Sequence, residues 1–224
     1  MRTRKKKWSA GELENNPRIL RNEGEYTGRF NEYLENQFGI SRPVHLELGC
    51  GKGRFIIETS RRNPDIHFVA VERDPTILAT AARRAEEGGA GSLVFVLADV
   101  NDKLEFIRPG DISRLYINFC DPWSRKKKWA KRRLTHDTYL EMYEKLQIPE
   151  LFFKTDNRIL FEASLESLSR RNWLMKNIAL DLHASEYATS GENIMTEYEE
   201  KFSAHGPIYR LEATPPAARE VQNT

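Results

Sequence analysis

Short apolar runs alternate with longer helical patterns along most of this chain, and this alternation limits the fold more than any other feature. The runs 66–72 and 92–99 are apolar at nearly every position, which is typical of strands that are buried on both faces. Segments with helical spacing separate these runs, and parallel strands need crossover connections of about that length. The sequence therefore predicts an α/β fold, in which a mostly parallel sheet carries helices on both faces.

The prediction comprises seven strands, and helices follow most of them. The strands are expected at residues 44–48, 66–72, 92–99, 113–119, 150–156, 173–182 and 208–213. The main helices are expected at 53–63, 75–89, 134–147 and 158–172, after an earlier helix that ends at Gly39. Ligands of such sheets bind beyond the carboxyl ends of the strands, so the residues that follow each strand are the candidates for function.

Positive charge is concentrated in two short runs. Five cations lie within residues 2–7 and seven lie within residues 125–133. Because the net charge of all 224 residues is only +2, the rest of the chain is acidic. A tryptophan lies in or beside each run, Trp8 and Trp129, and this combination favours a nucleic acid partner over two solvated loops.

Length and composition fit one domain with an arm. A hydrophobic fraction of 39% is enough for a core, which argues against global disorder. We expect a basic N-terminal arm and helix over residues 1–39, a main domain over 40–215 and a frayed tail over 216–224. Residues 1–21 are expected to be mobile while no nucleic acid is bound.

The two cysteines, Cys50 and Cys120, have no CxxC or Cys/His spacing, so no metal site is predicted. No apolar run is long enough to cross a membrane. We therefore expect a reduced, cytoplasmic protein, and either a monomer or a homodimer is compatible with the sequence.

A glycine-rich turn follows the first predicted strand. Gly49, Gly51 and Gly53 have GxGxG spacing, which alone is a weak sign of a nucleotide, since a buried strand often simply turns at glycines. Glu72 strengthens it, because it ends the next strand, 19 positions after Gly53, where a carboxylate can accept hydrogen bonds from ribose hydroxyls. Asp99 follows the third strand, where it can either recognise the edge of adenine or cap a helix.

Glu47 separates two classes of nucleotide ligand. A dinucleotide would place its pyrophosphate on the glycine turn, and a carboxylate two residues before the first glycine would repel it by several kcal/mol. S-adenosylmethionine, which combines adenosine with a cationic amino-acid end, suits Glu47 instead. The alternative is a local ion pair of Glu47 with Lys52 or Arg54.

The motif Asp121-Pro122-Trp123 follows the fourth predicted strand. Proline favours extended geometry in the residue before it and so directs the Asp121 carboxylate, while Trp123 offers a face on which a base can stack. A ring nitrogen such as guanine N7 has a lone pair and no proton, so its methylation needs in-line placement rather than a strong base. Asp121 could stabilise the positive charge that forms on the purine. A structural turn with a core tryptophan is the alternative, and Cys120 is a poor nucleophile because no base is evident beside it.

Six motifs together resemble the bacterial tRNA (guanine-N7)-methyltransferases of the TrmB family. They are ELGCGKG, VERD, NFCDPW, KRRLT, FKTDN and MTEYEEKF, and the resemblance covers about residues 1–213 in this order. The resemblance implies a Rossmann-like class I methyltransferase fold, with S-adenosylmethionine as methyl donor. It also implies transfer to N7 of the guanine at position 46, in the variable loop of tRNA.

The same resemblance assigns roles to individual residues. It implies cofactor contacts for Glu47, Glu72 and Asp99, and both cofactor binding and catalysis for Asp121. Substrate binding is implied for Asp156, Thr196, Glu197, Tyr198 and Glu199. The spacing after Asp-Pro-Trp is one residue longer than usual, so the substrate-contacting cation is either Arg125 or Lys126.

Two other functions stay open at this point. A methyltransferase for an exocyclic amine of a base would carry an Asp-Pro-Pro-aromatic signature, from which this chain lacks the second proline. A non-catalytic RNA-binding module would keep the basic runs, but it would not need carboxylates after successive strands. A hydride-transferring enzyme is disfavoured by Glu47 and by the glycine spacing.

Overall fold

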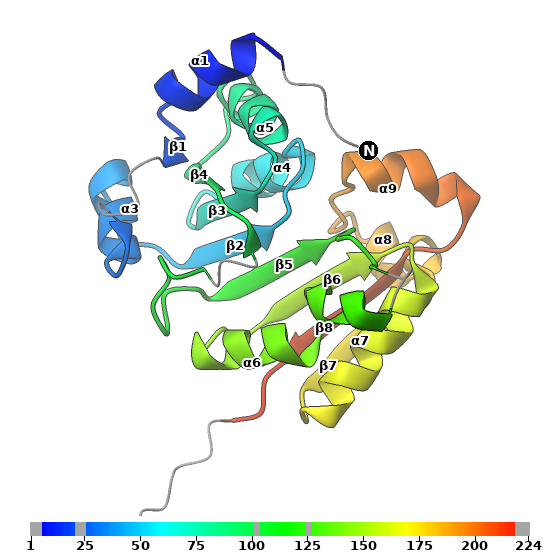
Figure 1. The fold of residues 1–224 in the computed structure, drawn as a ribbon. Coiled ribbons are helices and arrows are strands. Elements are labelled where there is room, and N and C mark those ends of the chain that lie inside the picture. Colours follow the sequence, from blue (N-terminus) through cyan, green and yellow to red (C-terminus); the bar gives the residue numbers. More distant parts are fainter. Residues whose placement is uncertain (1–5, 21–25, 101–103, 124–126, 218–224) are drawn as a thin grey trace, which may run out of the picture.

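The computed structural model describes residues 6–20, 26–100, 104–123 and 127–217, and its centre is one eight-stranded sheet (Figure 1). The strands are β1 (Ile19–Leu20), β2 (Val44–Leu48), β3 (His67–Glu72), β4 (Leu93–Leu97), β5 (Arg114–Asn118), β6 (Leu151–Thr155), β7 (Leu174–Ala179) and β8 (Tyr209–Thr214). Each of the seven predicted strands is present, with ends that differ from the prediction by three residues at most. The predicted count of seven is wrong by one, because β1 adds an eighth strand.

The strand order is β1-β4-β3-β2-β5-β6-β8-β7. All neighbouring pairs are parallel except those that involve β8, which runs antiparallel to both β6 and β7. The chain leaves β2 toward β3 and β4, and it later returns to the other side of β2 as β5. This reversal of strand order between β2 and β5 creates the crevice in which open α/β sheets bind their ligands.

Helices cover both faces of the sheet, as predicted (Figure 1). The longer ones are α3 (Phe30–Phe38), α4 (Arg54–Arg62), α5 (Pro75–Glu87), α6 (Asp137–Lys145) and α7 (Arg158–Arg170), and the shorter ones are α1 (Trp8–Asn15), α8 (Glu186–Thr189) and α9 (Glu197–Phe202). Three 3₁₀ helices are η2 (Lys127–Arg132), η3 (Leu182–Ala184) and η4 (Ser203–His205). Among the described residues, no helix is long and apolar enough to cross a membrane.

Local signals explain where several helices begin and end. Gly39 takes the left-handed conformation that ends α3, and Pro75 occupies the first turn of α5 after the capping residue Asp74, as such sequences favour. At α6 the cap is His136, although threonine, the type of the preceding residue Thr135, is more common at this position. The Thr135 hydroxyl is buried and lies 2.6 Å from the hydroxyl of Ser164 on α7, so tertiary packing overrides its capping tendency.

The alternation of side chains along each strand divides the core into two parts. Val69 and Val71 of β3 pack with α3, α6 and α7 on one face, whereas Phe68 and Ala70 pack with α4 and α5 on the other. Because both faces are buried, β2 to β5 are apolar throughout much of their length. Glu47 in the middle of the sheet, paired in register with Ala70 and Tyr116, is therefore an exception that needs an explanation.

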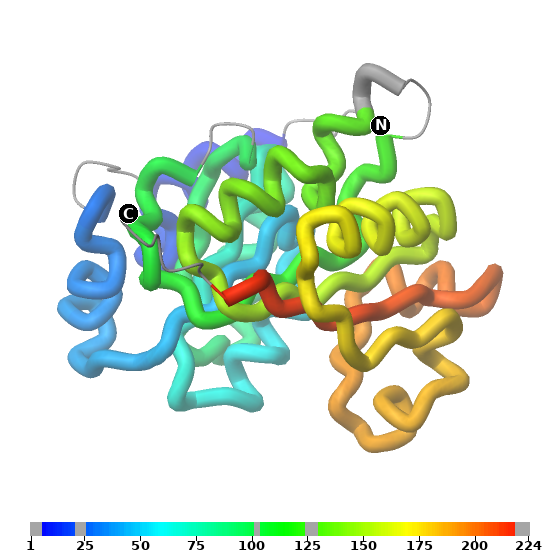
Figure 2. The backbone as a smooth tube through the Cα atoms, turned by 90° about the horizontal axis from the view of Figure 1, so that it is seen from below, coloured from blue at the N-terminus to red at the C-terminus, as the bar shows by residue number. Residues whose placement is uncertain are grey.

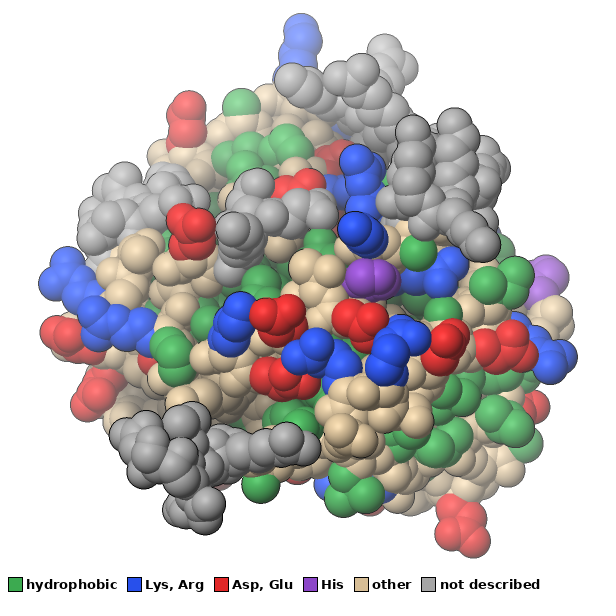
Figure 3. Space-filling model, turned by 60° about the horizontal axis from the view of Figure 1, so that its bottom comes forward, with side chains coloured by type: hydrophobic (Ala, Val, Ile, Leu, Met, Phe, Trp, Pro, Cys, Tyr) green, Lys and Arg blue, Asp and Glu red, His purple; other side chains and the backbone are tan. Residues whose placement is uncertain are grey.

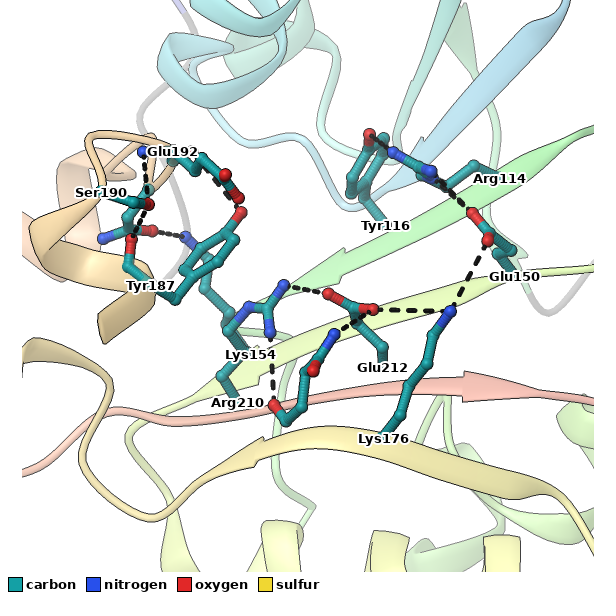
Figure 4. A network of polar contacts seen from close by, with 12 residues as sticks. Arg114, Tyr116, Glu150, Lys154, Lys176, Tyr187, Ser190, Glu192, Arg210 and Glu212 are labelled. Atoms are coloured by element: carbon teal, nitrogen blue, oxygen red, sulfur yellow. Dashed lines mark hydrogen bonds and ion pairs between the residues drawn. The ribbon is translucent and has the colours of Figure 1, made fainter. Parts of the chain in front are cut away.

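In the part of the sheet formed by β6, β8 and β7, one face is polar. The segment 181–205 lies at this end of the sheet. Figures 1 and 2 show this segment at the opposite end of the molecule from α3. A chain of contacts runs across the strands here, from Arg114 to Glu150 at 2.7 Å, then through Lys176 to Glu212 at 3.8 Å (Figure 4). Arg210 continues it and stacks 3.7 Å from the ring centroid of Tyr187. Paired charges thus replace the apolar core in this part of the sheet.

The surface in Figure 3 carries a band of intermixed positive and negative side chains. Ion pairs of this kind join α6 to α7, for example Arg170 to Asp137 at 3.1 Å and Arg171 to Glu144 through its Nε at 2.9 Å. Because positive and negative charges are mixed on this described surface, it does not favour the binding of a polyanion.

The N-terminal segment contradicts the expectation that residues 1–21 order only on RNA. Over residues 6–20 it forms α1 and β1, and β1 pairs with β4. Arg18 anchors it, since its guanidinium donates to the carbonyl oxygens of Ala90, Gly91 and Leu93 at 2.9–3.1 Å and pairs with Glu86 at 2.5 Å. Trp8, which lies beside the first basic run, packs against Arg83, whose guanidinium carbon lies 4.0 Å from the ring centroid.

We expect Arg18→Ala to destabilise the protein. Loss of these hydrogen bonds leaves partly buried carbonyl oxygens without a donor, which costs about 3 kcal/mol and lowers Tm by ~6–12 °C in a chain of this size. Differential scanning calorimetry measures the shift. Arg61→Ala is the matched control, because Arg61 is half-exposed and pairs only with Glu58 one turn away. A Tm for Arg18→Ala equal to that of the control would contradict this role.

Candidate active site

The glycine turn after β2 is held against the end of β3. The backbone N–H groups of Gly49 and Cys50 donate to the Val71 carbonyl oxygen at 2.8 and 3.1 Å. Gly53, with φ of +82°, is the N-cap of α4, and a Cβ there would lie 3.0 Å from the Cβ of Ala81 on α5. This position therefore requires glycine for its backbone conformation and for the close approach of two helices.

Glu72 connects the turn to the strand beside it. One carboxylate oxygen accepts from the backbone N–H of Gly51 at 3.1 Å, and the other accepts from those of Arg73 and Asp74 at 2.8 and 2.9 Å. A carboxylate offers about four acceptor sites, so the side chain retains capacity for one more donor. Glu72 also lines a cavity, which makes that capacity available to a ligand.

Glu47 is buried at the bottom of the site, with 2% of its surface exposed. Asn118 of β5 donates to its Oε1 at 2.8 Å, whereas its Oε2 is buried and has no hydrogen-bond partner in the described structure. Burial raises the pKa of Glu47 from 4.5 to about 7, against the opposing effects of Asn118 and of the charge of Lys154. The local ion pair with Lys52 or Arg54 weighed above is not what holds this carboxylate. An unpaired buried carboxylate oxygen is costly and marks a place for a cationic donor.

Two cavities meet at the turn and share Gly49 and Phe119 in their walls. The first has a volume of about 240 Å³, and Glu72, Asp99 and Asp121 line it. The second has a volume of about 220 Å³, and Glu47, Gly51 and Tyr198 are among its lining residues. The predicted cofactor residues are thus distributed along one continuous path over the carboxyl ends of β2 to β5.

Asp121 lies at the mouth of the first cavity. Its carboxylate is 60% exposed and forms an ion pair with Arg73 at 3.0 Å. Two residues before it and two residues after it, the backbone is in the left-handed conformation, with φ of +51° at Phe119 and +46° at Trp123. This conformation is unusual for large side chains and occurs most often at functional sites. The guanidinium of Arg132 lies 5.0 Å from the Trp123 ring centroid.

Both cysteines are poorly suited to nucleophilic chemistry. Burial raises the pKa of the Cys120 thiol to about 12, and burial also raises that of Cys50. A thiol reacts as its thiolate, so neither forms an effective nucleophile near neutral pH.

Helix α9 closes the second cavity from above the sheet. Thr196 caps it through a reciprocal capping box with Glu199. Glu197 forms an ion pair with Arg84 at 2.5 Å.

The Tyr198 hydroxyl donates to Asp156 at 3.2 Å, and the Tyr198 ring lies 5.2 Å from that of Phe119. Three of the expected substrate residues, Thr196, Glu197 and Tyr198, thereby line this cavity, and a fourth, Asp156, contacts Tyr198.

Glu199 has a different environment from its neighbours in this motif. It is completely buried and forms an ion pair with Lys154 at 2.8 Å. It lies beneath the wall of the cavity rather than on its surface, so we assign it no direct substrate contact. Arg125 and Lys126, the two candidates for a substrate-contacting cation, lie outside the described residues.

Sequence reasoning assigned no role to three polar residues of the site, namely Asn118, Arg73 and the buried cation Lys154, although Arg73 directly follows a predicted strand. A signal existed for Lys154, because a lysine within the apolar run 151–155 requires a buried partner. No comparable signal indicated that Asn118 would bind Glu47 or that Arg73 would bind Asp121, because these partners lie 71 and 48 positions away in the sequence.

Comparisons with known proteins place the chain in a family. A family model described as a putative methyltransferase matches residues 41–211. The tRNA (guanine-N(7)-)-methyltransferase of Listeria welshimeri is 44% identical over 217 residues, which are 95% of this chain and 98% of that protein. The enzyme of the same name from Clostridioides difficile is 44% identical over 180 residues, which are 79% of this chain and 82% of that protein.

Solved structures support the fold. The 16S rRNA methyltransferase KamB superposes with a TM-score of 0.60 at 14% identity and covers 85% of this chain and 95% of its own. A 16S rRNA (adenine(1408)-N(1))-methyltransferase from Catenulisporales acidiphilia, solved with its cosubstrate S-adenosylmethionine, gives a TM-score of 0.55 at 13% identity and covers 87% and 95%. These likenesses confirm the Rossmann-like class I architecture. Together with relatives at 44% identity over nearly the whole chain, they show that this chain belongs to the family of bacterial tRNA (guanine-N7)-methyltransferases.

Proposed function

We propose that this protein transfers the methyl group of S-adenosylmethionine to N7 of a guanine in tRNA, at position 46 of the variable loop. The observation that carries the proposal is the buried, unpaired oxygen of Glu47 at the base of a cavity. This carboxylate oxygen favours a cationic ligand and disfavours one that carries a phosphate. The family to which the chain belongs supplies the acceptor base.

The residues along the two cavities suit the methyl donor, which supplies an activated methyl group on a sulfonium when it is bound. Glu47 would accept from its ammonium group, and Glu72 would use its remaining acceptor site for a ribose hydroxyl. Asp99 lines the first cavity just after β4, which lies two strands from β2, and it would contact the adenine. Gly49 and Gly51 let the ligand approach the backbone between these ends.

The acceptor side needs little proton chemistry. N7 of guanine already carries a lone pair, so the protein contributes placement and stabilisation of the positive charge that the purine acquires. Asp121 provides that charge at the mouth of the first cavity. Arg73 must then share Asp121 with the base, because the two side chains form an ion pair in the described structure.

Cations near this mouth are suited to the RNA backbone. Arg132 lines the first cavity, and it ends the 3₁₀ helix η2, in the second basic run. Phosphate contacts of this kind give affinity without sequence information, so the shape of the folded tRNA has to supply most of the selectivity.

The experiment that tests this proposal uses methyl-labelled S-adenosylmethionine and an unmodified tRNA transcript. The product is digested to nucleosides and analysed by mass spectrometry, and we expect the label in 7-methylguanosine. A transcript in which adenine replaces the guanine at position 46 should remain unlabelled. Label in an amine-methylated nucleoside would favour the exocyclic-amine alternative, and RNA binding without label would favour the non-catalytic module.

A further inference from the structure

Lys154 lies at the carboxyl end of β6, with 6% of its surface exposed. Its ammonium donates to Glu199 Oε2 at 2.8 Å, to the Ile194 carbonyl at 3.0 Å and to Asn193 Oδ1 at 3.1 Å. A lysine has three donors, and here all three have acceptors in one short segment, 193–199. This single side chain therefore fastens that segment to the end of the strand.

Glu199 completes the connection from the other side. It is fully buried, and its Oε1 accepts from Asn193 at 2.8 Å and lies 3.3 Å from His183 Nε2. Its Oε2 also accepts a hydrogen bond from the backbone N–H of Thr196 at 3.4 Å. Two buried charges of opposite sign need each other, because either alone would lose its hydration without compensation. A satisfied buried network of this kind favours one arrangement of the chain over others.

The segment held in this way forms part of both substrate sites. Thr196 and Tyr198 line the cavity that contains Glu47, and Tyr198 contacts Asp156 and Phe119. Lys154 itself lies 5.3 Å from the ring centroid of Phe55, another lining residue of that cavity. A displacement of the segment would therefore change the donor end and the acceptor end of the site together.

We propose that Lys154 and Glu199 form a buried positioning pair, which holds the segment 193–199 over the carboxyl ends of the strands so that one wall orients both the methyl donor and the guanine. This inference rests on the proposed function for the identity of the two ligands. Neither side chain touches the reacting atoms, so both are positioning residues.

The test compares two variants with a matched control. Lys154→Met keeps the length of the side chain but removes its charge and its donors. Because this leaves the charge of Glu199 buried and unpaired, a second variant combines Lys154→Met with Glu199→Gln and removes both charges. Lys176→Met is the control, since Lys176 is half-exposed on the same sheet and its ion pairs are with Glu150 and Glu212 (Figure 4).

Three measurements distinguish an effect on the position of the segment 193–199 from an effect on the stability of the protein. In both Lys154 variants we expect faster hydrogen–deuterium exchange of the peptide 193–199 than in the control. The dissociation constant of S-adenosylhomocysteine should rise about tenfold, equivalent to ~1.4 kcal/mol, and kcat for tRNA should fall by a similar factor. The Tm should drop in the single variant and recover in the double variant, while exchange and affinity stay altered.

A double variant that is folded but matches Lys176→Met in exchange, affinity and kcat would overturn the inference. The two proposals fail separately. Absence of 7-methylguanosine with the wild-type protein would refute the proposed function, whereas the exchange rate of residues 193–199 still tests the pair, because it depends on no assumption about the substrate.

Discussion

Asp121→Asn is expected to lower kcat for tRNA methylation by about 100- to 1000-fold, the usual effect of removing one preorganised electrostatic group from an active site. Asparagine keeps the size of the side chain but cannot balance the positive charge that forms on the purine. The carboxylate is 60% exposed and pairs only at the surface with Arg73, and surface pairs of this kind contribute little to stability. The loss of turnover should therefore come with an unchanged Tm.

Single-turnover kinetics with saturating donor measure this effect, and filter retention of tRNA at low salt checks that the complex still forms. Asp65→Asn is a suitable control, because Asp65 is exposed and precedes β3 at the opposite edge of the sheet. If Asp121→Asn turned over within about threefold of this control, Asp121 would not be the electrostatic group of the reaction. If tRNA retention were lost as well, its role would be structural.

Glu47→Gln is expected to weaken binding of S-adenosylhomocysteine, whose ammonium group would otherwise meet the carboxylate. A hydrogen bond to a charged group contributes about 1.5–3 kcal/mol, so the dissociation constant should rise by ~10- to 100-fold. Isothermal titration calorimetry measures the change. Glu58→Gln, on the exposed side of α4, is the matched control.

The same substitution should alter the pH dependence of binding. The pKa of Glu47 is raised to about 7, chiefly by burial, so below this pH the carboxyl is protonated and cannot attract an ammonium. The other charged groups that act on it are Lys154 and Glu72. Wild-type affinity should therefore rise roughly eightfold between pH 6 and 7.5, and Glu47→Gln should remove this rise. An equally steep rise in the variant would show that another group titrates.

The free energy of unfolding gives an independent check, because Glu47→Gln is expected to increase it while the same substitution weakens ligand binding. Because the pKa of Glu47 is higher in the folded state than its ordinary value of 4.5, the native state binds more protons than the unfolded state between these two values. Its stability consequently falls as the pH rises through that interval. Glu47→Gln removes this cost and should be more stable than the wild type at pH 8, so weaker binding cannot be attributed to unfolding.

The main strands were predictable because each is a nearly continuous apolar run, and parallel topology then places their carboxyl ends at one edge. This rule brings Glu47, Glu72, Asp99 and Asp121 together without further information. The short β1 could not be predicted, because Ile19 and Leu20 stand between polar residues. What fixes β1 is Arg18, whose acceptors lie more than 70 positions away.

The substrate side was less predictable for a related reason. The acidic appearance of the motif Thr196–Glu199 suggests four exposed contacts, but the capping box turns one carboxylate inward. Its partner Lys154 lies 45 positions earlier. Pairing of a buried cation with a buried anion depends on the tertiary path between them, which local patterns do not encode.

The central claim is that a cationic methyl donor lies over the glycine turn, between the carboxylates at the ends of β2, β3 and β4. A crystal structure with S-adenosylhomocysteine tests it most directly. The account predicts its amino group within hydrogen-bond distance of Glu47 Oε2, its ribose at Glu72 and its adenine beside Asp99. Electron density for the ligand elsewhere, or over the turn with Glu47 still unpaired, would contradict it.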